Sequence, residues 1–486
     1  MSAVAYDLLI RDGTVVTATE TARCDIGVRG GRIVALGEDL AAGKTVIEAD
    51  GRFVTPGGID SHCHIEQMSA VGIMNADDFE SATRSAALGG TTTVIPFACQ
   101  HKGDDLAAIT ADYHARAARG AVVDYAFHLI VTDPTSKTMD DLSRLVPQGH
   151  GSIKIFLTYD AMRLDDEAVL DVLLKARELG ALVMAHAENH GMIAWMVKRL
   201  LARGHTAPKF HAVSHPRASE AEAFTRLIAM AELIDQPVMI YHVATAEGAA
   251  VIANARGRGL KVYGETCPQY LFLTAADLDR PDGGKVICSP PLREAADQEA
   301  LWAALQRGDL QTVTSDHAPF SYDAAGKLAA GPDATFKQIA NGMPGLLWRL
   351  PLLFDAIVSQ GRMDIRDFVR LTATAPAHIY NLADRKGAIA IGRDADLVIW
   401  DADRRVPLTD DLVADKTGYN PYAGRTLTGW PDTVVRRGEV IVSEGAMVAA
   451  PGSAAFLPRG GGEAARPRGV AAPEFDPVRN FGADLY

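Results

Sequence analysis

Apolar and polar residues alternate at both ends of the chain, in short runs that turn residues interrupt. Near the start these runs cover residues 7–16, 25–37 and 44–54, and the same pattern returns over 392–403 and 430–448. Alternation over a few residues is typical of half-buried strands, and the glycine and aspartate residues between the runs favour turns. We therefore expect residues 1–55 and 385–450 to form one small β-sandwich domain.

Between these ends, continuous apolar runs alternate with segments of helical periodicity, which is the pattern of parallel βα units. The runs that qualify as strands cover residues 53–60, 91–97, 124–131, 152–157, 181–186, 237–242, 260–265 and 310–316. Segment 75–90 is of the helical type, with an acidic start, apolar periodicity and a Gly-Gly stop. The repeats predict an α/β fold, a (β/α)8 TIM-like barrel over residues 56–384, whose active site lies at the carboxyl ends of the strands.

The last segment, residues 451–486, is rich in glycine, proline and alanine. Such a composition does not favour a packed element of its own. We expect an extended C-terminal arm, which either wraps a neighbouring subunit or forms a disordered tail.

The composition narrows the class of partner. The chain has 486 residues, 48% of them hydrophobic, which is enough for a barrel-sized core and a smaller domain. Its formal net charge is -13 and it has no block of lysine or arginine, so a nucleic-acid or membrane partner has no electrostatic support and a small molecule is expected. The five cysteines form no C-x-x-C pair, and no stretch approaches the roughly 18 apolar residues of a membrane span, which together predict a cytoplasmic protein.

Metal-compatible side chains recur where the predicted strands end. They are His62 and His64 after the first strand, His186 and His242 at the ends of the fifth and sixth, and Asp316 in the eighth. Alternate side chains of an extended segment share a face, so His62 and His64 can meet at one ion while Cys63 points away. Each histidine alone is more often a packing or surface residue. Their joint placement predicts a metal site, because buried polar groups need partners.

Lys154 lies inside the fourth predicted strand, with apolar neighbours on both sides. It could simply form an ion pair near the barrel mouth. Alternatively, burial lowers the pKa of an amine, and a neutral amine can add carbon dioxide. The resulting carbamate has two oxygens, enough to bridge two cations at the separation of about 3.5 to 4 Å typical of two-metal sites.

A series of motifs resembles the hydantoinase/dihydropyrimidinase family of cyclic amidohydrolases. They are G-x-x-D-x-H-x-H from Gly57, K-I-F-L-T-Y from Lys154, H-A-E-N, G-E-T-C-P-Q-Y-L, C-S-P-P-L-R, S-D-H and N-G-M-P-G. The similarity runs in order from about residue 5 to about residue 450. The H-x-H pair alone would be a weak signal, whereas the ordered series is specific.

The resemblance implies two Zn2+ ions per subunit, bridged by N6-carboxylated Lys154. His62, His64 and Asp316 would bind one ion, and His186 and His242 the other. The resemblance also implies that Tyr159 donates a hydrogen bond to the carbonyl oxygen under attack, with a structural tyrosine on the barrel rim as the alternative. Main-chain groups at Ser289 and Asn341 would hold the ring amide, and Asp316 would transfer the proton as catalytic base.

Four further polar residues lie close to the predicted ligands, and no catalytic role is predicted for them. His317 follows Asp316 and should face away from it. Glu188 and His190 are expected to begin the helix after the fifth strand, and Glu265 either orients a ligand histidine or caps its strand.

The loop after the H-x-H pair departs from the D-x-P-F type loop of many similar hydantoinases. Here it is I-E-Q-M-S-A-V-G-I-M-N, with apolar residues that include Met68 and Ile73. We expect Met68 and Ile73 to contact an apolar or aromatic ring substituent, although the loop could merely cover the barrel.

The predicted activity is zinc-dependent ring opening of a 5-substituted hydantoin or a dihydropyrimidine, giving an N-carbamoyl amino acid. A cyclic imide hydrolase is the first alternative and an allantoinase the next. A non-catalytic interaction protein of the same fold is a further alternative, but such relatives have lost metal ligands that are present here. From the resemblance we also expect a homo-oligomer, a tetramer or a dimer.

Overall fold

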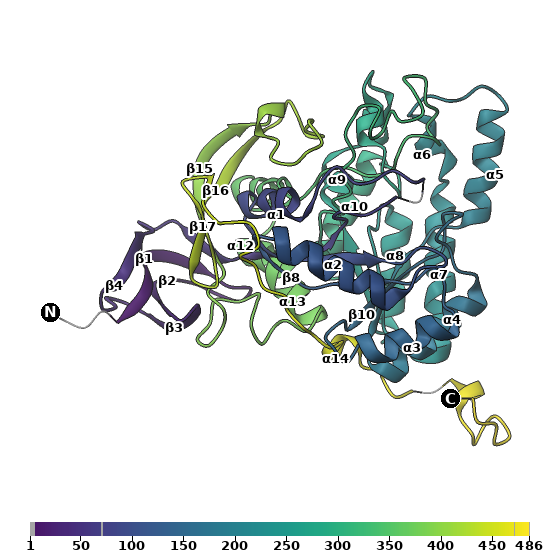
Figure 1. Ribbon diagram of the computed structural model, residues 1–486, viewed down its shortest axis with the longest axis horizontal. Coiled ribbons are helices and arrows are strands. Elements are labelled where there is room, and N and C mark those ends of the chain that lie inside the picture. The colour runs from purple at the N-terminus through teal and green to yellow at the C-terminus, as the bar shows by residue number, and fades with distance from the viewer. Residues whose placement is uncertain (1–4, 70, 471, 486) are drawn as a thin grey trace.

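The computed structural model describes residues 5–69, 71–470 and 472–485. Strands from the two ends of the chain lie together at one side of the molecule, and the barrel occupies the other (Figure 1). Within the described residues, no helix has both the length and the apolar character needed to cross a membrane.

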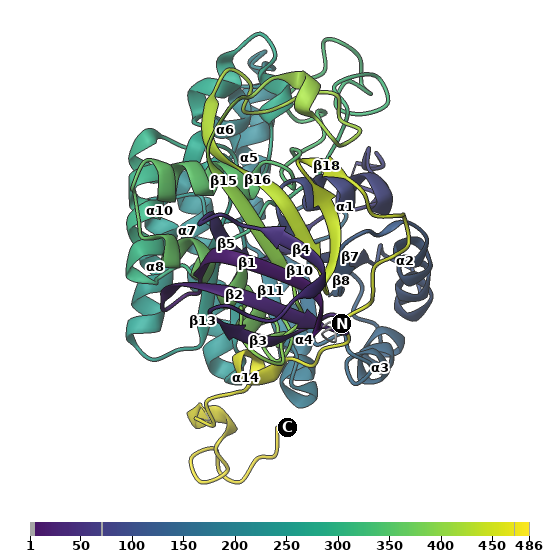
Figure 2. The same ribbon diagram turned by 90° about the vertical axis from the view of Figure 1, so that its left-hand side faces the viewer.

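The two chain ends share one hydrogen-bonded sheet. Its strands run in the order β18-β17-β16-β15-β5-β1-β2-β3, and β4 pairs with β1. They are β1 (Tyr6–Val16), β2 (Thr21–Arg29), β3 (Arg32–Gly37), β4 (Gly43–Glu48), β5 (Phe53–Pro56), β15 (Leu397–Pro407), β16 (Thr426–Arg436), β17 (Glu439–Ser443) and β18 (Ala446–Met447). Figure 2 shows β15 and β16 beside β5 and β1, although several hundred residues separate them in the chain. A separate apolar core that includes Leu8, Ile26 and Ile399 holds this β-rich domain together.

Parallel strands form the second sheet, in the order β14-β13-β12-β11-β10-β9-β7-β6, with β8 paired to β7. They are β6 (Gly58–Cys63), β7 (Thr91–Cys99), β8 (Asp124–Tyr125), β9 (His128–Ile130), β10 (Ser152–Phe156), β11 (Leu182–His186), β12 (Val238–Ile240), β13 (Val262–Thr266) and β14 (Thr312–Val313). The amide of His64 donates to the carbonyl of His317 at 2.7 Å, which joins the ends of the first and last strands. The fold is therefore the predicted TIM-like barrel with a β-rich domain beside it.

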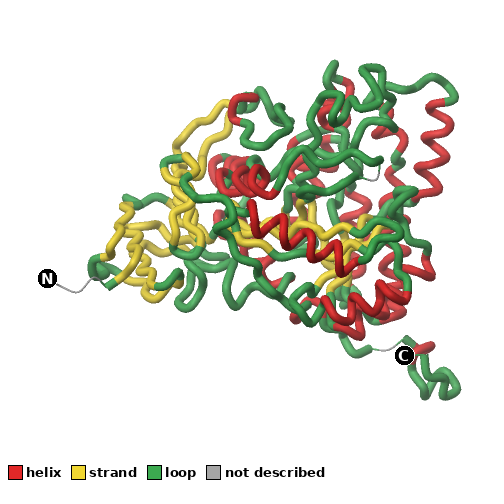
Figure 3. Tube along the Cα trace, viewed as in Figure 1, coloured by secondary structure: helices red, strands yellow, loops and turns green. Residues whose placement is uncertain are grey.

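Helices surround the barrel strands, as the red and yellow segments of Figure 3 show. They are α1 (Phe79–Leu88), α2 (Leu106–Gly120), α3 (Ser136–Leu145), α4 (Asp166–Leu179), α5 (His190–Leu201), α6 (Phe210–Ser214), α7 (Arg217–Ile234), α8 (Ala246–Gly257), α9 (Pro268–Phe272), α10 (Ala295–Arg307), α11 (Arg349–Phe354), α12 (Ile365–Val369), α13 (Ala375–Ile379) and α14 (Gly462–Ala465). Local signals in the sequence explain their ends. The Asp78 side chain accepts from the Ser81 amide at the start of α1, and Gly180 ends α4 in the left-handed conformation.

The first predicted strand differs from the structure in one respect. Residues 53–60 form two strands, because β5 pairs with β1 and β15 in the β-rich domain while β6 pairs with β7 in the barrel. The second of them extends to Cys63, so that His62 lies within the strand and not after it. The crossing between the two domains at Gly57 thus places His62 directly in the barrel wall.

The segment after β18 packs under the barrel before it leaves the body of the protein. Leu457 is fully buried, and its amide donates to the Tyr125 carbonyl at 2.7 Å. Arg459 is also buried and donates to the Ser152 hydroxyl at 2.7 Å. Beyond α14 the chain projects away from the barrel (Figures 1 and 2), and there Val478 and Phe481 are exposed.

Candidate active site

The six predicted metal-binding side chains lie around one cavity at the carboxyl ends of the barrel strands. The cavity has a volume of about 420 Å3, within the range of small-molecule sites. Its lining includes His62, His64, Lys154, His186, His242 and Asp316. Parallel strands bring their carboxyl ends to one face, which is why residues far apart in the sequence meet here.

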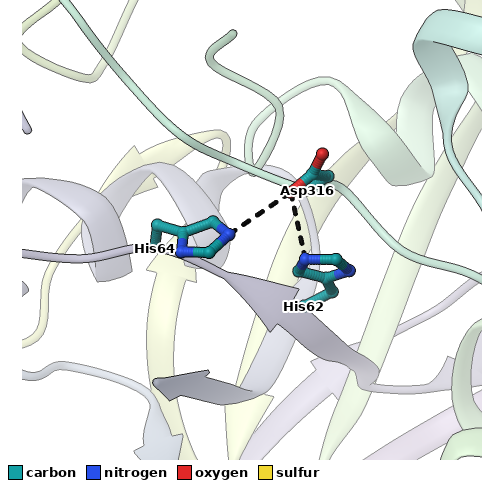
Figure 4. A group of neighbouring side chains, drawn as sticks. All are labelled: His62, His64 and Asp316. Carbon is teal, nitrogen blue, oxygen red and sulfur yellow. Dashed lines mark ion pairs between the residues drawn. The ribbon is translucent and has the colours of Figure 1, made fainter. Parts of the chain in front are cut away.

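His62, His64 and Asp316 form the first half of the site, and their candidate ligand atoms all lie within 4.8 Å of one another. The Asp316 Oδ1 atom lies 3.1 Å from His62 Nε2 and 3.5 Å from His64 Nε2, as the dashed lines in Figure 4 mark. The other ring nitrogens are occupied, since His62 Nδ1 contacts Glu265 and His64 Nδ1 lies 2.7 Å from Gln67 Oε1. These contacts turn both Nε2 atoms toward the cavity, as in metal sites whose ligands are oriented by neighbours.

Charge in this half of the site favours a cation. Burial acts to lower the pKa of His62, but the carboxylates of Asp316 and Glu265 outweigh it and raise that pKa. Conversely, burial would raise the pKa of Asp316, yet its contacts with His62 and His64 hold that pKa well below the usual value. Asp316 is therefore ionised at neutral pH, and the site concentrates negative charge where a cation would sit.

His186 and His242 form the second half, with ring centroids 4.4 Å apart. The Nε2 atom of His186 lies 2.9 Å from Glu188 Oε2. The Nδ1 atom of His242 is buried and has no hydrogen-bond partner among the described residues. Burial lowers the pKa of both histidines, so they are neutral imidazoles. A buried, unpaired ring nitrogen beside a second imidazole fits a bound metal ion, which would supply the missing partner.

Lys154 borders the same cavity, and its side chain is 1% exposed. Its Nζ atom lies 3.9 Å from the centroid of the Tyr241 ring and 5.1 Å from that of Phe156. Burial lowers the pKa of Lys154 to about 7, against the opposing effect of Glu265 and Asp316. A large fraction of this amine is thus uncharged at neutral pH, as the addition of carbon dioxide requires.

Tyr159, Ser289 and Asn341 lie together on the cavity wall. The Tyr159 hydroxyl is hydrogen-bonded to both other side chains, and Asn341 Nδ2 donates to Ser289 Oγ at 2.9 Å. Burial and the nearby Glu188 raise the pKa of Tyr159, so its hydroxyl keeps its proton and can donate. The structure therefore places the three residues side by side, on loops that follow different strands.

Three site residues have the left-handed backbone conformation that side chains other than glycine rarely adopt. They are Tyr159 (φ 71°), His242 (φ 43°) and Asp316 (φ 46°). Backbone conformations of this kind cluster at functional sites, where the surrounding structure holds them in place. Here each one follows a barrel strand and turns its side chain toward the common cavity.

The apolar loop after His64 contributes only part of what the sequence predicted. Met68 and Val71 line the cavity, but Ile73 is not among the lining residues. The loop folds back on itself, with the Ser69 amide donating to the Ile73 carbonyl at 2.8 Å and a bridge between Met68 and Met74. Ile73 thus lies on the returning limb. The cavity gains other apolar contacts from Phe336 and Ile339, which lie on a distant loop.

Several residues with no predicted catalytic role support the site. Glu265 contacts His62 and so orients a candidate ligand histidine. The next helix starts at His190, so Glu188 is not part of it. Instead Glu188 turns inward and contacts two histidines: Oε2 lies 2.9 Å from His186 Nε2, and Oε1 lies 2.8 Å from His215 Nδ1. The two-residue spacing from His186 to Glu188 was the available signal, since alternate residues of an extended segment share a face.

His317 is not among the residues that line the cavity, and it anchors the turn that carries Asp316. Its Nε2 lies 2.9 Å from Asp77 Oδ2, and its Nδ1 accepts from the Gly345 amide at 3.0 Å. The buried His317 ring therefore ties the loop after β14 to two other segments of the barrel mouth.

Comparison with known proteins agrees with this geometry. The model of the amidohydrolase family matches residues 53–441. A D-hydantoinase from Ralstonia pickettii is 40% identical over 456 residues, which cover 93% of this chain and 99% of the relative. A D-hydantoinase from Geobacillus stearothermophilus is also 40% identical, covering 93% and 96%. The crystal structure of dihydropyrimidinase from Brevibacillus agri is 39% identical with a TM-score of 0.90, covering 93% of this chain and 99% of that one. The chain therefore belongs to the amidohydrolase family, in the group of hydantoinases and dihydropyrimidinases that its motifs resemble.

Proposed function

We propose that this protein is a metal-dependent hydrolase that opens cyclic amides, such as a 5-substituted hydantoin or a dihydropyrimidine, to N-carbamoyl amino acids. The observation that carries the proposal is the convergence of four histidines, an aspartate and a buried lysine on one cavity. Relatives named D-hydantoinase, at 40% identity over nearly the whole chain, support the same reaction class.

The residues of the site fit two Zn2+ ions. His62, His64 and Asp316 would hold one ion and His186 and His242 the other, with Lys154, carboxylated on Nζ, shared between them. When bound, these ions would supply a water of pKa about 7 and positive charge beside the carbonyl group that is attacked. Glu265, Gln67 and Glu188 orient three of the histidines and so set the geometry of the site.

Asp316 serves as the proton carrier in this proposal. Its Oδ1 atom faces both His62 and His64, which leaves Oδ2 free to accept a proton from the attacking water. The low pKa of the carboxyl keeps it ionised at neutral pH, so the oxygen carries no proton before the reaction begins. The same oxygen then delivers the proton to the ring nitrogen as the amide bond breaks.

Tyr159 stabilises the carbonyl oxygen as negative charge develops on it. Its hydroxyl keeps a proton across the neutral pH range and is held in place by Ser289 and Asn341. Preorganised donors of this kind usually supply the largest electrostatic contribution in acyl transfer. The main chains at Ser289 and Asn341 hold the ring amide beside it.

The ring substituent would lie against the apolar part of the wall. Met68, Val71, Phe336 and Ile339 all line the cavity. These side chains favour an apolar or aromatic substituent over the polar or anionic ones of allantoin and dihydroorotate. A flat aromatic imide such as phthalimide suits the same wall, which makes cyclic imide hydrolysis the second candidate.

A substrate panel tests the proposal. We expect 5-phenylhydantoin to be opened fastest, ahead of dihydrouracil and phthalimide, with allantoin slowest. Chelation should abolish each activity, and added Zn2+ should restore it, with two ions bound per subunit. Full activity after exhaustive chelation, or no ring opening by the metal-loaded protein, would contradict the proposal. We also propose that the protein is a cytoplasmic homo-oligomer. Size measurement in solution can check the oligomeric state.

A further inference from the structure

Lys327 carries a buried amine without an acidic partner. The residue is 0% exposed, and no carboxylate of the described residues lies within ion-pair distance of its Nζ atom. Instead, Nζ donates to the carbonyl of Ile287 at 3.0 Å and to that of Ala340 at 2.9 Å. Removing an amine from water is costly unless its hydrogen bonds are replaced, so this arrangement needs a reason.

The two acceptor carbonyls belong to two different loops of the cavity wall. Ile287 precedes Cys288 and Ser289, and Ala340 precedes Asn341 and Gly342. The four residues that follow the acceptors all line the cavity, whereas Lys327 itself does not. Lys327 therefore lies behind the wall and joins two loops that meet in front of it.

The loops have further bonds to each other. The Gly342 amide donates to the Ile287 carbonyl at 3.0 Å, and Asn341 Nδ2 donates to Ser289 Oγ at 2.9 Å. The Tyr159 hydroxyl bonds to the same two side chains. Among these contacts, only the Lys327 side chain binds the Ala340 carbonyl. This bond fixes the residue next to Asn341.

We infer that Lys327 is a positioning residue that sets the spacing of the Ser289 and Asn341 loops, and thereby the fit of the ring amide between them. A lysine that only filled space would be replaced at lower cost by methionine, which has a similar length and no polar head to bury. The identity of the ligand in this inference rests on the proposed function. The contact between the loops does not depend on that function.

The main test replaces Lys327 by methionine in the full-length, metal-loaded protein. Without the amine the Ala340 carbonyl loses its donor and the two loops move relative to each other, although their direct bonds remain. KM for hydantoin should therefore rise about 10-fold, the effect of weakening one hydrogen bond to the ring amide, with kcat falling less. Metal content should stay at the wild-type value. The rise should appear with unsubstituted hydantoin, because the loops hold the ring amide itself. Lys327→Arg, which keeps N–H donors, should recover part of the loss.

Lys386→Met is the matched control. Lys386 is a second buried amine, but it binds Asp124 at 2.8 Å and Asp396 at 2.6 Å, close to the β-rich domain. This variant should lose thermal stability and keep its KM. A similar rise of KM in both variants, an unchanged KM in Lys327→Met, or a loss of bound metal would overturn the inference. Should Lys327→Met fail to fold, the shorter Lys327→Leu, which also lacks an N–H donor, replaces it with the same expectation.

Hydrogen exchange tests the contact without any substrate. The Gly342 amide, which is bonded to Ile287, should exchange at least about 10-fold faster in Lys327→Met, while the amides of α4 stay unchanged. Unchanged protection of Gly342 would refute the role of Lys327. If the wild-type protein opens none of the rings, the proposed function fails while this measurement still decides the inference.

Discussion

Reconstitution of the metal-free protein should depend on carbon dioxide, with a pH dependence that Lys154 dictates. The lone pair of its Nζ atom forms a bond to the carbon of CO2, one C=O electron pair moves to oxygen, and the amine releases a proton to the buffer. Only the uncharged amine has this lone pair. Since burial lowers the pKa of Lys154 to about 7, the reaction should be fast at neutral pH.

The size of the effect follows from the protonation equilibrium. At about pH 7.5, an amine with a pKa of about 7 is uncharged in about three quarters of the molecules, whereas an ordinary lysine is uncharged in about one in a thousand. The carboxylation rate should therefore rise about 10-fold from about pH 6 to about pH 8 and then level off. For an ordinary lysine it would rise about 100-fold over this range and continue to rise above it.

The assay starts from protein that has been stripped of metal and carbonate at low pH. Zn2+ is added at a constant concentration of dissolved CO2, and bound metal and the 13C signal of the carbamate are followed over time. We expect one carbamate per chain and little metal uptake without CO2. Lys154→Arg should give no carbamate. Lys327 is the internal comparison, because burial also lowers its pKa to about 7 but its Nζ is bonded to two carbonyls. A carbamate that persists in Lys154→Arg, or a rate that keeps rising above about pH 9, would refute the reasoning.

Other variants separate the remaining roles. Asp316→Asn should lower kcat at least about 100-fold while much of the metal stays bound, and near-wild-type turnover would remove its role as proton carrier. Tyr159→Phe should lower kcat at least about 100-fold. Its control is Tyr419→Phe, because that hydroxyl donates to the Lys285 carbonyl at 3.1 Å, outside the cavity lining, and the variant should keep its kcat. Equal losses in the two tyrosine variants would point to a structural effect. Glu265→Gln should weaken metal binding about 10- to 100-fold in a chelator competition, and unchanged affinity would show that His62 needs no orienting partner.

The sequence alone was enough to predict the barrel and the family. Parallel strands buried on both faces produce continuous apolar runs, and these runs coincide with the barrel strands within a few residues. The candidate ligand residues could be proposed for a similar reason, because the carboxyl ends of barrel strands always meet at one face. Residues such as His186 and His242 thus needed only a correct assignment of the strands.

What the sequence could not provide was the arrangement of the loops. Glu188 and His190 are equally polar and two residues apart, yet one bridges two histidines while the other begins α5. Ile73 has the character of a cavity residue, but the fold of its loop turns it onto the returning limb. Strand direction and burial follow from local periodicity, which the sequence carries. The packing of loops from different strands depends on contacts between residues far apart in the chain, and only the tertiary structure decided it.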